Sequence, residues 1–177
     1  MKNRKTVVVA FLLVAVMLLG VGYATLTNTL NITADLKADP SKAGSEFDGD
    51  VYFSNKNIDK DDTNHASCII ENNDLATITA DMFTTANQEV VVTLTITNDS
   101  TDFDAVLTPD VSLDAAHDGI FAASCVWEGT DNLNQKTIPA GGSANLTVTL
   151  KLLKTPDEAH QAKFTVDFEV KSAEAAG

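Results

Sequence analysis

Residues 88–98 read QEVVVTLTITN, and this stretch decides the fold class. Its even-numbered positions from 90 to 96 are all apolar, whereas positions 93, 95 and 97 are all threonine. Successive side chains of a β-strand point to opposite faces, so the alternation predicts a strand with one face on a core and the other toward solvent.

The same design recurs later in the chain. Residues 144–152 and 164–170 carry apolar side chains at every second position. Shorter strands are predicted at 51–54 and 75–80, and turn signals such as Asn98-Asp99-Ser100 and Pro139 to Ser143 separate the strands. Residues 82–98 and 137–154 share one layout, which predicts corresponding strands in two different sheets. Only 114–123 and 156–162 look weakly helical, so we expect an all-β, antiparallel two-sheet sandwich.

An amphipathic stretch also stands near the front of the chain, where residues 25–36 read TLTNTLNITADL. Its even positions are mostly apolar, with Asn28 as the exception, and its odd positions are polar. This pattern predicts a strand that could pair with the exposed edge of another sheet. The side chains expected to fill apolar pockets there are Leu26, Leu30, Ile32 and Leu36.

The residues before this strand have the three parts of an export signal. A basic start is followed by an apolar run from Val7 to Val21, and then by Gly22 and Ala24 on either side of Tyr23. We expect cleavage between Ala24 and Thr25. The alternative is a retained anchor, which needs about 20 apolar residues and therefore a longer run than this one.

The acidic net charge of the chain argues against nucleic acid as a partner. Lys2, Arg4 and Lys5 are the only charged residues before Thr25, so cleavage takes the 12 basic residues to 9 and the formal net charge from −13 to −16. Nucleic-acid binding needs clustered Lys and Arg, so we expect no nucleic-acid partner. A charge of this size should also make any self-association depend on salt, protons or divalent cations.

A family resemblance rests on residues 20–28, GVGYATLTN, and on residues 138–143, IPAGGS. Together with the paired alternating strands, they resemble the TasA and camelysin type of exported proteins of Gram-positive bacteria. The resemblance implies a jelly-roll-like sandwich behind an N-terminal signal helix, processing by a dedicated signal peptidase, and secretion to the extracellular matrix or cell surface. It also implies assembly into biofilm-matrix fibres, with an accessory matrix or anchoring protein as a further partner.

Two cysteines, Cys68 and Cys125, are compatible with one disulfide in an exported protein. Closing a loop of about 57 residues would contribute roughly 4 kcal/mol in the chain-entropy model. Two free, buried thiols are the alternative, because sequence spacing does not show whether the two side chains meet.

Catalytic and metal-binding patterns are weak. The three histidines, His65, His117 and His160, lack the spacing of a helical zinc site, and we expect no catalytic residues and no cofactor. The acidic run Asp59 to Asn64 offers oxygen ligands of the kind that calcium takes, but it departs from the EF-hand pattern. We expect a solvated loop there, with weak divalent-cation binding as the alternative.

The sequence therefore predicts a signal at 1–24, an exchangeable strand at 25–36, a sandwich domain at 37–174 and a tail at 175–177. The predicted function is that of a secreted structural protein whose copies join into fibres through the N-terminal strand. A camelysin-like metalloprotease and a monomeric surface adhesion module are the alternatives. In a monomeric module, the same strand would pair within its own chain.

Overall fold

The computed structural model describes residues 29–38, 49–113, 119–155 and 161–174, which form ten strands and no helix. The strands are β1 (Thr29–Ala38), β2 (Val51–Asp61), β3 (Ala66–Glu71), β4 (Leu75–Ala80), β5 (Glu89–Asn98), β6 (Phe103–Leu113), β7 (Phe121–Trp127), β8 (Lys136–Ile138), β9 (Ser143–Leu152) and β10 (Gln161–Glu174). The predicted leader lies outside the described residues, within which no helix is long and apolar enough to cross a membrane.

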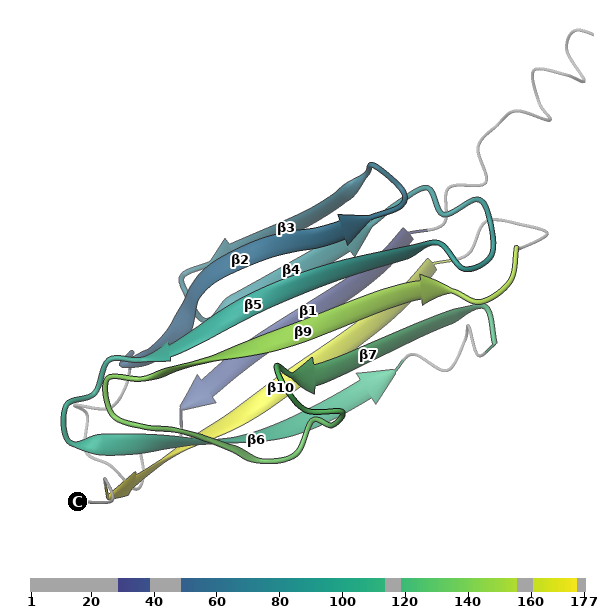
Figure 1. Cartoon of the computed structure of the whole chain (residues 1–177). Coiled ribbons are helices and arrows are strands. Elements are labelled where there is room, and N and C mark those ends of the chain that lie inside the picture. Colours follow the sequence, from purple (N-terminus) through teal and green to yellow (C-terminus); the bar gives the residue numbers. More distant parts are fainter. Residues whose placement is uncertain (1–28, 39–48, 114–118, 156–160, 175–177) are drawn as a thin grey trace, which may run out of the picture.

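The strands make two sheets that pack face to face (Figure 1). Sheet A has six strands in the order β3-β4-β1-β10-β6-β8, and sheet B has four in the order β2-β5-β9-β7. Of the ladders between described strands, only that of β1 with β10 is parallel. The prediction of an all-β fold with two mostly antiparallel sheets is confirmed.

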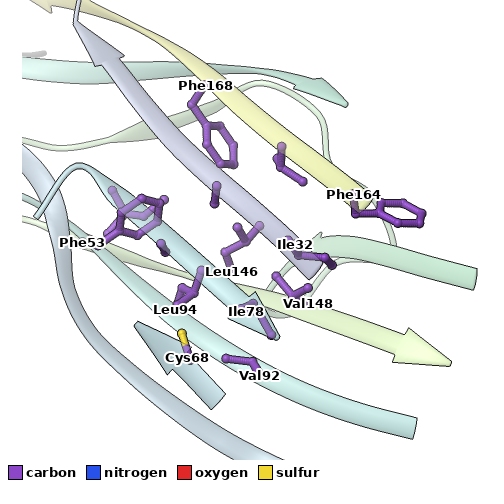
Figure 2. Close-up of a cluster of buried hydrophobic side chains, with 14 of the residues drawn as sticks. Ile32, Phe53, Cys68, Ile78, Val92, Leu94, Leu146, Val148, Phe164 and Phe168 are labelled. Atoms are coloured by element: carbon purple, nitrogen blue, oxygen red, sulfur yellow. The ribbon is translucent and has the colours of Figure 1, made fainter. Parts of the chain in front are cut away.

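The core lies between the sheets and follows the predicted alternation. The even positions 90–96 of β5, 146–152 of β9 and 164–170 of β10 are all buried. Figure 2 shows side chains of both sheets in one cluster, including Leu94 and Val148 of sheet B with Ile78 and Phe168 of sheet A. Burying one such aliphatic side chain contributes about 1.5–3 kcal/mol, so the alternating strands contribute much of the stability of the fold.

Three local predictions are wrong. The segments 82–98 and 137–154 contribute β5 and β9, which are neighbours in sheet B and pair at Thr93 and Thr147, rather than strands of two sheets. The weakly helical 114–123 and 156–162 end in strand residues, because Phe121 starts β7 and Gln161 starts β10; residues 114–118 and 156–160 lie outside the described part. Finally, the short strand predicted at 51–54 is longer than expected, because β2 continues as far as Asp61.

A buried asparagine ties the two sheets together at one end. Asn98, the last residue of β5, is fully buried, and its side-chain Nδ2 lies 3.0 Å from the carbonyl oxygen of Phe103 and 3.1 Å from that of Ile138. Its Oδ1 accepts from the backbone N–H of Ser100 at 3.1 Å. Each buried polar atom thus has a partner, which offsets the cost of its removal from water.

The turn at 138–143 is shaped to meet this asparagine. Gly141 has φ +66°, which favours glycine, and a Cβ at Gly142 would lie 2.9 Å from the carbonyl oxygen of Pro139. The Gly142 carbonyl oxygen accepts from the N–H of Asn98, and the Gly141 N–H donates to Ser100, each at 2.9 Å. In this chain, therefore, residues 138–143 have a structural role.

We predict that Asn98→Ala lowers the free energy of unfolding by about 2–4 kcal/mol, because it leaves several buried carbonyl groups without a donor. Urea denaturation followed by circular dichroism measures the change. Asn132→Ala is the matched control, since the side chain of this exposed residue makes one local bond, from the Asn134 N–H at 3.3 Å. A loss at Asn98 no larger than that at Asn132 would contradict the structural role of the cluster.

Candidate functional site

The predicted joining strand is β1, and it lies in the middle of sheet A (Figure 1). On one side it pairs with β4 in antiparallel register, with Thr33 opposite Thr77. On the other side it pairs in parallel with β10 along its whole length, from Thr29 opposite Gln161 to Ala38 opposite Val170. Since β4 and β10 are each bonded to β1 and not to each other, β1 fills a space that we call the β1 slot.

The inward face of β1 belongs to the core. Ile32 and Ala34 are fully buried, and Figure 2 shows Ile32 in the same cluster as Ile78, Val148 and Phe168. Among the other predicted joining residues, Leu30 stands in backbone register with Ala80 and Leu36 with Phe168. Leu26 and the predicted cleavage residues Ala24 and Thr25 lie outside the described residues.

The single chain therefore completes its own sheet with this strand, as expected for the monomeric alternative. The physical reason is proximity: only ten residues, 39–48, separate β1 from the described residues that lead into β2. A strand held by a short tether meets its own slot at an effective concentration of the order of millimolar. Joining of copies through β1 requires the strand to leave one slot and enter the same slot in another copy.

The acidic run predicted as a solvated loop or calcium site ends β2 and forms the turn into β3. One Asp61 carboxylate oxygen accepts from the Thr63 N–H at 2.9 Å and hydroxyl at 2.6 Å, while the other accepts from the Ala66 N–H at 2.9 Å. Burial raises the pKa of Asp61, but these hydrogen bonds outweigh it and leave the pKa lowered. Asp61 therefore shapes the turn as a carboxylate.

The neighbouring charges are paired as well. The Lys60 ammonium lies 2.7 Å from Glu89 and 3.1 Å from Asp62, and both carboxylates raise the pKa of this lysine. In the described part of the chain, no group of three or more His, Cys, Asp or Glu side chains has the geometry to hold a metal ion. Divalent-cation binding at Asp59 to Asn64 stays a prediction.

Both cysteines are free thiols in the structure, which corresponds to the second of the two alternatives above. Cys68 lies on β3, at one end of the strand order of sheet A, and Cys125 lies on β7, an end strand of sheet B. Burial raises the pKa of the Cys125 thiol to about 12. Burial also raises the pKa of Cys68, an effect that the nearby Lys56 partly opposes.

Among the histidines, the described part of the chain contains only His65, which is exposed in the β2–β3 turn. His117 and His160 lie outside it. Trp127 is a core residue: it is buried, its indole N–H donates to the Asn134 carbonyl at 2.8 Å, and its ring lies 5.6 Å from that of Phe168.

Sequence reasoning missed two groups of residues. The first is the Asn98 cluster, whose signal was a polar residue at an even, inward position of an otherwise apolar alternation. The second is a contact between β2 and β3, in which the Lys56 ammonium donates to the Cys68 carbonyl. No periodic pattern marks that contact, because β2 has register shifts between Phe53 and Asn55 and between Ile58 and Lys60.

Comparison with protein-family models finds no match for this chain, and comparison with curated proteins finds none either.

We predict that the native protein reacts slowly with a thiol reagent at pH 8, whereas the protein unfolded without reductant reacts at both cysteines. The raised pKa values keep Cys68 and Cys125 protonated, and the thiolate is the reactive form. Labelling with 5,5′-dithiobis(2-nitrobenzoic acid) counts the thiols. Absence of labelling in the unfolded protein would show a disulfide instead.

Proposed function

We propose that this protein is a secreted structural protein whose copies join into extracellular fibres by exchanging β1. The observation that supports the proposal most is the place of β1: it is an inner strand of sheet A, yet it begins four residues after the expected cleavage site, and ten residues separate it from the next described segment. A strand so placed can leave without the rest of the chain being rethreaded.

A chain with an empty β1 slot is less stable than one in which a strand fills the slot. Without β1, the hydrogen-bonding edges of β4 and β10 lose their partners, and core side chains such as Ile78 and Val166 lose the cover of Ile32 and Ala34. An unpaired sheet edge is a template for another strand. The best-fitting replacement is an identical β1 from a second copy, because it reproduces each ladder and each buried side chain.

Exchange in one direction produces a polymer. If each copy gives its β1 to the next copy and receives one from the copy before, the contact is head to tail, and it builds an open filament where the rotation between copies does not close a ring. The outer face of β1 carries polar side chains such as Thr33, as a strand exposed on the outside of a sandwich requires.

In this proposal, removal of the leader determines when the exchange of β1 can begin. As long as residues 1–24 hold the chain at the membrane, the start of β1 is tethered, and cleavage between Ala24 and Thr25 leaves four residues before Thr29. The implied partners are a signal peptidase, other copies of the chain, and an accessory protein that nucleates or anchors the fibre. The resemblance adds a jelly-roll-like topology and a signal helix to this proposal.

A pair of cysteine variants tests the exchange. Thr33→Cys is introduced in one preparation and Thr77→Cys in another, each with Cys68→Ala and Cys125→Ala; the two positions face each other in the β1–β4 ladder at a spacing that suits a disulfide. We expect oxidation of fibres grown from the mixture to link the two kinds of chain covalently. Mass spectrometry of the crosslinked peptide identifies the bond.

A mixture of Ser124→Cys and Thr149→Cys chains is the matched control. These positions face each other between β7 and β9, which stay in one chain whether or not β1 is exchanged, so their mixture should give no link between chains. Fibres without a link between positions 33 and 77 would overturn exchange of β1. Electron microscopy and N-terminal sequencing of the secreted protein test fibre formation and the start at Thr25 together.

A further inference from the structure

The free edge of sheet A at β3 has side chains from the opposite sheet laid across it. β3 is the last strand in the order of sheet A and pairs only with β4. β2, the last strand of sheet B, contacts it and is joined to it by the turn at 62–65. End strands of this kind expose N–H and C=O groups that can pair with another chain.

Three contacts from β2 and its turn occupy polar groups along this side. The Ala66 N–H donates to the Asp61 carboxylate at 2.9 Å, and the Lys56 ammonium donates to the Cys68 carbonyl. At the end of the β3–β4 turn, the Phe53 N–H of β2 donates to the Asn73 carbonyl at 2.7 Å. Thus one anionic side chain, Asp61, and one cationic side chain, Lys56, each form a hydrogen bond with a backbone group of β3.

These bonds show which residues of β3 face the free edge. In an antiparallel ladder, the N–H and C=O of one residue point to the same side, and successive residues alternate between the two sides. Since Ala66 and Cys68 bond to β2 side chains, the even residues of β3 point their backbone groups outward from the sheet. A ladder with a further strand would use those groups, so that strand competes with Asp61 and Lys56.

The sequence of β3 makes such competition relevant. Residues 66–71 read ASCIIE, a short segment with adjacent β-branched residues and one charge. Ile69 is 52% exposed on the outer face of the sheet. Segments with these features associate readily when their edges are open.

We propose that Lys56 closes the β3 edge and thereby prevents two copies of this protein from pairing through β3. Asp61 has a positioning role, because it holds the turn that keeps β2 across the edge. The partner excluded is the β3 strand of a second copy, in antiparallel register about a twofold axis, which is the arrangement a single strand can make with itself. The proposal does not depend on exchange of β1, which takes place at the centre of sheet A.

The test compares Lys56→Met with Lys56→Arg. Methionine keeps most of the aliphatic length of lysine but cannot donate to the Cys68 carbonyl, whereas arginine can. We expect Lys56→Met to dimerise with a dissociation constant lower by roughly tenfold or more than that of the unaltered protein, since it loses one charge-assisted hydrogen bond. Lys56→Arg should behave as the unaltered protein. Sedimentation equilibrium in reducing buffer measures both.

Lys154→Met is the matched control. Lys154 is exposed two residues beyond the end of β9, outside both β2 and β3, and its replacement changes the net charge and adds an exposed methionine in the same way. Adding Ile69→Lys to Lys56→Met should restore the monomer, because each copy then brings a positive charge to the same face of the short paired strands. Circular dichroism checks that each variant is folded, and Lys56→Leu, which also has no side-chain donor, replaces Lys56→Met if the latter is not.

Two results would overturn the proposal. One is a folded Lys56 variant without the ammonium group that sediments as the unaltered protein does. The other is association that Lys154→Met produces equally or that Ile69→Lys does not reverse, since the contact would then lie elsewhere on the surface. If the Thr33→Cys and Thr77→Cys chains form no disulfide with each other, that result contradicts only the proposed exchange of β1.

Discussion

Sheet A is continuous because β1 bonds to β4 on one side and to β10 on the other. If that strand is taken away, β3 and β4 form one fragment, and β10, β6 and β8 form another, each facing the core with an unpaired edge. The burial of Ile78, Val166 and Phe168 depends on the sheet being whole. The continuity of sheet A thus depends on the two ladders of β1.

The two neighbours of β1 run in opposite directions, so whichever way a strand enters this slot, one of its ladders is parallel and the other is antiparallel. A parallel ladder is slightly less stable per residue than an antiparallel one. Part of the slot is therefore lined by the weaker kind of pairing, while the neighbouring pairs β10–β6 and β3–β4 are antiparallel. Under the proposed exchange, this difference favours β1 over the other strands of sheet A.

Alternation predicted the strands whose inward residues are large. The sequence predicts β5, β9 and β10 because Val, Leu, Ile and Phe at every second position indicate a strand with one buried face. β7 reads FAASCVW, and its small inward Ala123 and Cys125 give no clear period. β6 contains Pro109, which ordinarily argues against a strand interior. β3 has only six residues, and the exposed Ile69 interrupts the polar face that Ser67 and Glu71 begin. What the sequence did not supply was long-range pairing: the contacts of Asn98 with Ile138 and of Lys56 with Cys68 depend on which strands become neighbours.

The period of two also explains why the sequence alone left the role of β1 open. The alternation of residues 25–36 is the same whether the strand lies in its own sheet or in that of another copy, and exchange replaces each contact of β1 with an identical one. Exchange by itself therefore contributes almost no net free energy, and a lone copy at low concentration keeps its own strand because of the short tether. The stability of a fibre must come from contacts between copies outside β1, and its onset from conditions that leave β1 unplaced when copies meet. A leader that holds the start of β1 at the membrane while many copies are exported side by side supplies such conditions, which is why cleavage and assembly are coupled in this proposal.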